Sequence, residues 1–335
     1  MLPVAGERRG AARRGTRRQR YLRSGPAGHN WQMRSSDKWL LAVRPATLPA
    51  SASGVIVGLG AARAAGAPFR LDAAAGCMAV ALLLQIAANL ANDLSDFRRG
   101  ADTPDRLGPT RVAASGLVTV RQLELAIGIV LAAAAVAGVG LALIGGPIFV
   151  LVGLGAMLAA LAYTGGPFAY GYHGLGEVFV FAFFGLVAVA GTAALQSGRL
   201  DWLYVAAAVP VGALTTGILV VNNLRDVSTD RAAGKRTLAV MLGVGFARAE
   251  YMACLVAAGA VPILLVAARW QWASDFAGPA ALLPLLPLLA TPLAVPLWRA
   301  VAADGDPRRL NLVLRGTARL TLVFAVLFAV GLAVR

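Results

Sequence analysis

The sequence has little cysteine, histidine or lysine. Its 335 residues include two cysteines, Cys77 and Cys254, which both lie in apolar runs, and two histidines, His29 and His173. Isolated thiols in apolar runs are typical of small buried side chains rather than of a disulfide or a metal-binding pair. The histidines have no ligand-like spacing to other donors, which argues against a histidine-based zinc site.

Charge is also scarce, and long apolar runs take its place. Only 14% of the residues are charged and 58% are hydrophobic, with a mean hydropathy of +0.70. An ordinary soluble domain has about 25% charged and about 45–50% apolar residues. Apolar runs of about 18 residues or more recur along the chain, whereas the short alternating segments of a transmembrane β-barrel are not visible. The composition predicts an all-α, polytopic membrane protein.

The apolar runs divide into nine predicted membrane spans. Each is close to the ~20 residues that a bilayer crossing needs. Turn-forming residues separate several of them, as at Gly145-Gly146-Pro147 and Gly165-Gly166-Pro167. The predicted spans are residues 45–65, 73–97, 121–144, 147–164, 175–195, 202–226, 239–268, 279–300 and 312–334.

The N-terminal segment differs from the rest of the chain. Residues 1–32 carry eight arginines and one acid, so +7 of the formal charge of +15 lies there, and no apolar signal sequence follows. Residues 1–37 are predicted to be a basic, disordered extension. The alternatives are a polybasic arm on an anionic membrane surface and an upstream start codon, with the working start at Met33. No folded reader module accompanies the basic residues, so nucleic-acid binding is not expected. Residues 38–335 form the predicted transmembrane domain.

The distribution of arginine and lysine predicts an orientation. Basic residues concentrate in the connections after the second, sixth and eighth spans, and the opposite connections have few. By the positive-inside rule, the N-terminus and these three connections are cytoplasmic and the C-terminus is outside. The expected location is therefore the cell (inner) membrane, with the acidic clusters described next on its cytoplasmic side.

A polar stripe interrupts the second predicted span. In a helix, Gln85, Asn89, Asn92 and Asp96 fall at i, i+4, i+7 and i+11 on one face. Lipid cannot solvate these groups, so they must face a protein interior or a water-filled cavity. Several charged residues follow: Arg98, Arg99, Asp102, Asp105, Arg106 and Arg111. Carboxylates followed by arginines suit a divalent cation that holds a phosphorylated ligand.

The sixth predicted span ends in a similar cluster. Asn222, Asp226 and Asp230 repeat every four residues, Asn223 lies beside them, and Lys235 follows. One acidic helix end is explained as a capped or solvated terminus, but two matching ends that each run into basic residues are not. Crowded carboxylates without a cation raise each other's pKa. Mg²⁺ keeps few protein ligands and takes the rest from water and phosphate oxygens, so the pair of clusters predicts Mg²⁺ with a diphosphate.

These motifs resemble the signature of the UbiA superfamily of intramembrane prenyltransferases, over residues 38–335. Asn92-Asp93-Leu94-Ser95-Asp96 matches the NDxxD-type motif after helix 2, and Asp226-Val227-Ser228-Thr229-Asp230 matches the DxxxD motif after helix 6. The resemblance implies a nine-helix transmembrane bundle. It also implies Mg²⁺-dependent transfer of a prenyl group from an allylic diphosphate to an aromatic ring.

Within the superfamily, the chain looks like the 1,4-dihydroxy-2-naphthoate polyprenyltransferases of menaquinone synthesis. The residues that carry this resemblance are 44–49 (RPATLP), 100–103 (GADT), 106–111 (RLGPTR), 115–116 (SG), 222–226 (NNLRD) and 233–237 (AGKRT). The position of the third acid, Asp102, agrees with this branch. The branch implies attack at the carboxylate-bearing carbon of 1,4-dihydroxy-2-naphthoate by a polyprenyl diphosphate, with loss of CO₂ and diphosphate, to give demethylmenaquinone.

The resemblance also implies roles for individual residues. The four expected Mg²⁺ ligands, which are also the catalytic residues, are Asp93, Asp96, Asp226 and Asp230. The expected substrate-binding residues are Asn89, Asn92, Asp102, Arg111, Asn222, Asn223, Arg231 and Lys235.

Two further residues are candidates for the acceptor pocket. Arg44 is expected to bind the acceptor's carboxylate, and the alternative is an arginine that snorkels to the membrane interface. Tyr163 is expected to line the pocket, and the alternative is an interfacial aromatic residue.

Two alternative functions remain open. A related enzyme could use 4-hydroxybenzoate, homogentisate or a chlorophyllide as its acceptor. A cation-coupled transporter would also carry acids inside a helical bundle. The acids here gather at one membrane surface and run into basic loops, which favours phosphate chemistry over alternating access.

Overall fold

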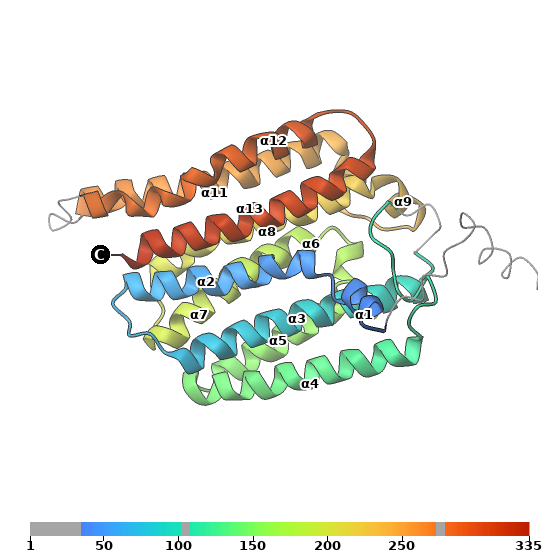
Figure 1. Ribbon diagram of the computed structural model, residues 1–335, viewed down its shortest axis with the longest axis horizontal. Coiled ribbons are helices and arrows are strands. Elements are labelled where there is room, and N and C mark those ends of the chain that lie inside the picture. Colours follow the sequence, from blue (N-terminus) through green and yellow to red (C-terminus); the bar gives the residue numbers. More distant parts are fainter. Residues whose placement is uncertain (1–34, 102–106, 273–278, 335) are drawn as a thin grey trace, which may run out of the picture.

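The protein is a bundle of helices that run along one common direction (Figure 1). The structure, a computed structural model, describes residues 35–101, 107–272 and 279–334, and no strand occurs among them. The helices are α1 (Ser35–Val43), α2 (Leu48–Ala64), α3 (Leu71–Arg98), α4 (Val120–Gly145), α5 (Ile148–Ala162), α6 (Gly176–Val180), α7 (Ala188–Ser197), α8 (Trp202–Arg225), α9 (Val227–Ala232), α10 (Leu238–Leu242), α11 (Val244–Trp272), α12 (Thr291–Ala302) and α13 (Leu310–Ala333). Shorter or tighter segments complete the chain: η1 (Pro45–Thr47), η2 (Tyr170–Tyr172), η3 (Phe181–Val187), η4 (Pro279–Ala290) and η5 (Pro307–Arg309).

These helices confirm the all-α membrane fold. Among the described residues, eight helices are long and apolar enough to cross a membrane, and α5 is a shorter apolar helix at the fourth predicted span. The division between the third and fourth spans is confirmed, because α4 ends at Gly145 and Gly146 adopts φ 90° before α5 begins. The fifth predicted span is formed by α6, η3 and α7 together. Residues 1–34 of the predicted extension lie outside the described part of the chain.

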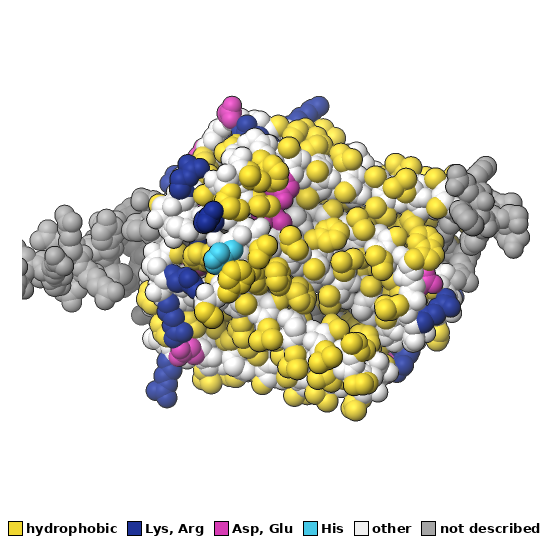
Figure 2. All heavy atoms as spheres, turned by 180° about the vertical axis from the view of Figure 1, so that it is seen from behind, with side chains coloured by type: hydrophobic (Ala, Val, Ile, Leu, Met, Phe, Trp, Pro, Cys, Tyr) yellow, Lys and Arg dark blue, Asp and Glu magenta, His cyan; other side chains and the backbone are white. Residues whose placement is uncertain are grey.

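The helices divide into an inner and an outer set. In α8, 72% of the most apolar window is buried within the protein, against 11% in α4. Leu143 of α4 is 84% exposed. Figure 2 shows a wide belt of hydrophobic side chains, with arginines and lysines gathered at its two ends. This distribution is the one that a hydrocarbon layer between two polar surfaces requires.

Close helix packing places α2 in the centre of the bundle. A Cβ added at Gly58 would lie 2.6 Å from the Val189 carbonyl oxygen of α7, and one at Gly60 would lie 2.5 Å from the Ala329 Cα of α13. Small residues let backbones approach in this way, which gains van der Waals contact where lipid supplies no hydrophobic drive between helices. The glycines of α2 therefore fix its position between α7 and α13.

The segment η3 departs from the regular helix expected over residues 175–195. It is π-helical from Phe181 to Val187, and its Gly185 packs so tightly on α8 that an added Cβ would lie 2.7 Å from the Gly212 Cα. A π-helical turn widens the helix and changes the direction in which its side chains point. Phe183 and Phe184 of this segment line the cavity described below.

The ends of α3 and α8 that carry the two acidic motifs lie at the same end of the bundle. α9, which follows α8, is at that end, and the C-terminus is at the opposite end (Figure 1). The polar loops that follow α3 and α8 therefore meet over one mouth of the bundle.

We expect Gly60→Ala to destabilise the fold, because its new Cβ would overlap Ala329. Overpacking of this kind costs about 1–3 kcal/mol, and thermal unfolding in detergent measures it. Gly128→Ala in α4 is the matched control. Nothing lies within 4 Å of its added Cβ, so alanine should gain roughly 1 kcal/mol of helix propensity there. Equal destabilisation by both substitutions would contradict the packing described for α2.

Candidate functional site

A cavity of about 370 Å³ lies inside the bundle and receives side chains from both halves of the chain. Its mouth is polar, with residues from the ends of α3 and α8 and from the loops that follow them. Farther along, the lining becomes apolar and aromatic, and its far residues include Cys77, Leu141, Phe149 and Leu195. The cavity thus offers a charged mouth and a hydrocarbon-like interior.

Asp96 is a carboxylate at the mouth with several partners. It is 1% exposed. Its Oδ2 accepts a hydrogen bond from Arg111 Nη2 at 2.8 Å, and its Oδ1 accepts one from the Tyr172 hydroxyl at 2.9 Å. Lys235 Nζ lies 3.3 Å from Asp96 Oδ1 and 3.4 Å from Asp96 Oδ2. Two cations and a phenol therefore hold this carboxylate facing the cavity.

Lys235 joins the two acidic motifs. Its Nζ also lies 3.7 Å from Asp230 Oδ1 and 4.8 Å from the centre of the Tyr172 ring. The preceding Gly234, at φ 73°, makes the turn after α9, and the Lys235 N–H donates to the Asp230 carbonyl at 2.9 Å. The backbone turn thus returns the ammonium group to the carboxylate of the same motif.

Tyr172 is held as a neutral phenol. Burial, together with the nearby negative charge of Asp96, raises the pKa of the Tyr172 hydroxyl. The group therefore stays protonated at neutral pH and donates to Asp96, while its ring face receives Lys235.

Asp226 is paired with its own neighbour in the sequence. Arg225 binds both oxygens of Asp226, with Nε to Oδ1 at 2.8 Å and Nη2 to Oδ2 at 2.5 Å. The same guanidinium donates to Asn222 Oδ1 at 2.8 Å and to Asn311 Oδ1 at 2.9 Å. Arg225 is 2% exposed, so this network fixes Asp226 and Asn222 at the cavity wall.

The asparagines of both motifs line the cavity, and hydrogen bonds to neighbouring side chains fix their orientation. Asn92 Oδ1 accepts from the Thr164 hydroxyl at 2.9 Å. Asn223 Nδ2 donates to Glu177 Oε1 at 2.8 Å. Side-chain amides held in this way present fixed donors and acceptors to a ligand.

Asp93 lies outside the cavity lining, in contrast to the prediction from the sequence. It is 1% exposed, and its two oxygens accept the backbone N–H groups of Val112 and Ala113, each at 3.0 Å. One residue along a helix changes the side-chain direction by about 100°, which separates Asp93 from the stripe of Asn92 and Asp96. Asp93 therefore anchors the loop that carries Arg111.

Other predicted residues divide between the cavity and the surface. Arg44, Asn89 and Tyr163 line the cavity. Arg231 is exposed, and its Nη2 lies 3.5 Å from the Val240 carbonyl oxygen, away from the lining. Asp102 lies outside the described residues.

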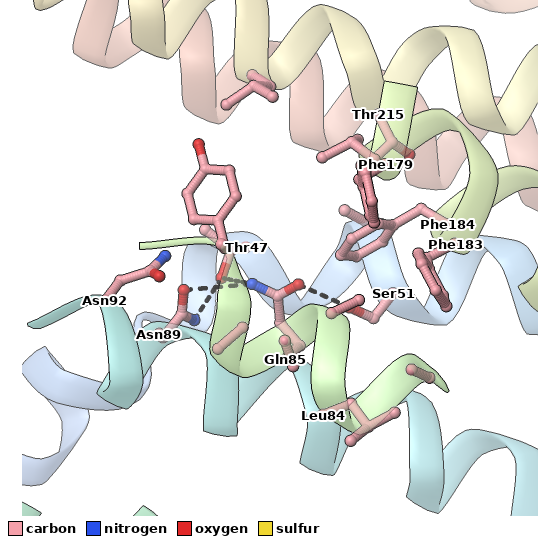
Figure 3. Close-up of a pocket in the computed structure, with 18 of the residues that line it drawn as sticks. Thr47, Ser51, Leu84, Gln85, Asn89, Asn92, Phe179, Phe183, Phe184 and Thr215 are labelled. Carbon is pink, nitrogen blue, oxygen red and sulfur yellow. Dashed lines mark hydrogen bonds between the residues drawn. The ribbon is translucent and has the colours of Figure 1, made fainter. Parts of the chain in front are cut away.

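A set of uncharged polar side chains also lines the cavity, deeper than the carboxylates. Gln85 contacts Thr47, Ser51 and Asn89 through hydrogen bonds of 3.2, 3.1 and 3.3 Å. Figure 3 shows these residues facing the same space as Phe179, Phe183 and Phe184. The sequence placed Gln85 and Asn89 on the polar stripe and Thr47 in the motif of residues 44–49, but Ser51 carried no signal of its own.

Arg225 and Thr164 are the other site residues that the sequence prediction missed. The signal for Arg225 was its position next to Asp226 at the end of an apolar helix, where an unpaired buried arginine would be costly. Thr164 gave no signal, because a threonine at a helix end is common and its contact with Asn92 depends on the packing of α5 against α3.

The carboxylates at the mouth fit a Mg²⁺ ion that takes only a few of its ligands from the protein. Within residues 35–101, 107–272 and 279–334, no three histidine, cysteine or acidic side chains form a ready-made metal cage. Asp96 and Asp230 nevertheless both lie close to one ammonium group, Lys235 Nζ, at 3.3 and 3.7 Å. Mg²⁺ commonly keeps one or two carboxylates and takes its other ligands from water and phosphate oxygens. The geometry fits a metal that arrives with a phosphorylated ligand.

Residues 53–311 match the model of the UbiA prenyltransferase family. The chain belongs to this family. It is 41% identical over 302 residues to the 1,4-dihydroxy-2-naphthoate octaprenyltransferase of Mycobacterium tuberculosis, covering 90% of this chain and 98% of that protein. It is 34% identical over 314 residues to the enzyme of the same name from Escherichia coli, covering 90% and 96%.

Solved UbiA structures have the same fold. A UbiA homologue from Archaeoglobus fulgidus bound to DMAPP and Mg²⁺ aligns with a TM-score of 0.60 at 17% identity, over 88% of this chain and 99% of that one. The apo UbiA homologue from Aeropyrum pernix K1 aligns with a TM-score of 0.59 at 22% identity, over 89% and 97%. This UbiA protein is thus an integral membrane protein of the same helical architecture.

The different positions of Asp93 and Asp96 give a test. We expect Asp96→Asn to raise the Mg²⁺ concentration for half-maximal prenyl transfer by at least about 10-fold. Asp93→Asn should leave that concentration within about twofold, because Asp93 contacts a loop rather than the cavity. It should lower stability by about 1–3 kcal/mol, since one of the two buried N–H groups, Val112 or Ala113, would face an amide NH₂ in place of an acceptor. Mg²⁺ titrations and thermal unfolding measure the two effects. If Asp93→Asn raised the Mg²⁺ concentration for half-maximal activity as much as Asp96→Asn, Asp93 would be a metal ligand after all.

Proposed function

We propose that this UbiA protein transfers a polyprenyl group from an allylic polyprenyl diphosphate to 1,4-dihydroxy-2-naphthoate, releasing diphosphate and CO₂ and forming demethylmenaquinol, the reduced form of demethylmenaquinone. The observation that carries the proposal is one cavity with a mouth formed by both acidic motifs and an apolar interior. The relatives named 1,4-dihydroxy-2-naphthoate octaprenyltransferase support the choice of acceptor.

The diphosphate belongs at the charged mouth. Asp96 and Asp230, with Asp226 beside them, would hold Mg²⁺, which when bound supplies Lewis-acid stabilisation of the leaving diphosphate. Lys235 and Arg111 contact these carboxylates in the structure. Their donors are therefore within reach of phosphate oxygens that lie at the same carboxylates, and such charge-assisted bonds are strong. Arg225 stays with Asp226 and keeps it in position.

The prenyl chain belongs in the apolar part of the cavity. Asp96 and Cys77 of α3 both line the cavity. At 1.5 Å per residue they lie about 28 Å apart along the helix axis. The walls along this path include Leu84, Val80 and Leu141. Burial of an isoprenoid there gains about 25 cal/mol per Å² and keeps water from the allylic carbon as its bond to oxygen breaks.

The acceptor chemistry fits a cavity whose carboxylates are already paired with cations. The C–O bond of the diphosphate breaks, and a C–C bond forms at the ring carbon that bears the carboxylate. The bond from that carbon to the carboxylate then breaks, its electron pair restores the aromatic ring, and CO₂ leaves. Because no C–H proton is removed from that carbon, this step needs no external base. Arg44, at the cavity wall, is the proposed partner of the acceptor's carboxylate.

The proposed orientation follows from the charges. Basic residues at this end of the described bundle include Arg111, Arg225, Arg231, Lys235 and Arg236, and by the positive-inside rule this end would face the cytoplasm. The C-terminus, at the other end of the bundle (Figure 1), would then lie outside.

Product analysis tests the function. Membranes that contain the protein, supplied with Mg²⁺ and a polyprenyl diphosphate, should convert 1,4-dihydroxy-2-naphthoate to a prenylated, decarboxylated lipid that mass spectrometry identifies. Asp226→Asn should lose about 10²-fold or more of this activity while still folding, because electrostatic groups at the leaving diphosphate contribute on this scale. If only 4-hydroxybenzoate or homogentisate gave a product, the proposed acceptor would be wrong, but the assignment to the UbiA family would stand. Ion-driven flux without prenyl transfer would favour a transporter.

A further inference from the structure

The inference concerns the four residues Thr47, Ser51, Gln85 and Asn89, which we name the amide wall. All four line the cavity. Asn89 and Gln85 precede Asp96 on α3 by seven and eleven residues, which places them about 10 and 16 Å deeper along the helix axis. Groups at that depth lie beyond a diphosphate held at the mouth and beside whatever reacts with it.

Every side-chain hydrogen that the amide wall could donate is already used inside the protein. Gln85 Nε2 donates to Thr47 Oγ1 and to Asn89 Oδ1. Asn89 Nδ2 donates to the Val43 carbonyl at 2.8 Å and to Thr47 Oγ1 at 3.0 Å. The hydroxyl of Thr47 donates to the Arg44 carbonyl at 2.9 Å, and that of Ser51 to Gln85 Oε1 at 3.1 Å.

The remaining capacity of the amide wall is therefore to accept hydrogen bonds. An amide oxygen has two lone pairs and a hydroxyl oxygen also has two. One lone pair remains on Gln85 Oε1 and one on Asn89 Oδ1, and both remain on Ser51 Oγ, whereas Thr47 Oγ1 already accepts two bonds. A prenyl chain has no donor and would leave this remaining capacity unused, whereas a ligand with O–H groups would use it. The wall matches a ligand that carries O–H groups.

The aromatic surroundings of the amide wall favour a ligand with a flat ring. Phe179, Phe183 and Phe184 face the same space as the amide wall (Figure 3). Aromatic side chains on one side and fixed acceptors on the other suit an aromatic ring with hydroxyl groups at its edge.

We propose that the amide wall selects the acceptor by accepting a hydrogen bond from a ring hydroxyl, with Gln85 Oε1 as the main acceptor. The inference rests on the proposed function for the identity of the ring. For 1,4-dihydroxy-2-naphthoate, the recognised group is the 4-hydroxyl, which lies away from the carboxylate-bearing carbon that reacts. Gln85 is thus a specificity-determining residue and takes no part in bond making or breaking.

The test compares two ligands that differ only in this hydroxyl, 1,4-dihydroxy-2-naphthoate and 1-hydroxy-2-naphthoate. Their binding to purified protein is measured by anaerobic titration calorimetry. The wild type should bind the dihydroxy ligand about 5- to 10-fold more tightly, the range of one neutral hydrogen bond. Gln85→Met keeps the length of the side chain. It should bring the ratio of the two affinities close to one, because it weakens the binding of the dihydroxy ligand alone. The KM for polyprenyl diphosphate should stay within about twofold.

A matched control separates recognition from helix packing. Gln196 is another buried glutamine that joins two segments, with hydrogen bonds of 2.7 and 2.9 Å to the backbone of Arg70, and it is not part of the cavity lining. Gln196→Met should keep the wild-type binding ratio. If Gln85→Met fails to fold, Ser51→Ala, which removes one acceptor, should reduce the ratio about 2- to 3-fold.

Two results would overturn the inference. One is a wild type that binds both ligands equally, and the other is a Gln85→Met protein that weakens both in the same proportion, as a purely structural residue would. Failure of the proposed function looks different. If the protein prefers the dihydroxy ligand in calorimetry but forms no prenylated product, the inference about the amide wall stands and the proposed prenyl transfer is refuted.

Discussion

The structure depends on the meeting of two acidic helix ends that are far apart in the chain. Lys235 contacts Asp96 across 139 residues of sequence and also contacts Asp230. Buried carboxylates in a membrane protein are costly unless they are paired, so each of these groups requires the other half of the bundle. That pairing holds α3 and α8 at one mouth, and the cavity lies between them.

At the mouth, the carboxylates are already balanced by arginine and lysine side chains before any ligand enters. Asp96 contacts Arg111 and Lys235, and Asp226 contacts Arg225. A metal with a diphosphate brings both charges at once, so it can exchange partners with these ion pairs without leaving a buried charge alone. The arrangement explains why the described residues form no ready-made metal cage, since Mg²⁺ is suited to a few carboxylates completed by phosphate and water.

The cavity separates tasks by depth along α3. Asp96 lies at the charged mouth, Asn89 and Gln85 belong to the uncharged amide wall, and Cys77 lies in the apolar end. One helix thus passes from ionic to hydrogen-bonding to apolar contacts, which suits a diphosphate at the mouth, an aromatic acceptor beside the first part of the prenyl chain, and the rest of that chain in the apolar end. The π-helical segment η3 supplies phenylalanines from the opposite side, and its contact with Gly212 keeps it close to α8.

The sequence alone determined the membrane class, the approximate spans and the polar stripe, because hydrophobic length and helical spacing are local properties that each segment carries by itself. The matched motifs also determined that α3 and α8 act together. Only the tertiary structure decided that Asp93 contacts a loop, that Arg231 stays outside the cavity, that Arg225 pairs with Asp226, and that Thr47 and Ser51 line the cavity. These assignments depend on which partner each side chain meets, and the partners come from segments that only the packing of the bundle brings into contact.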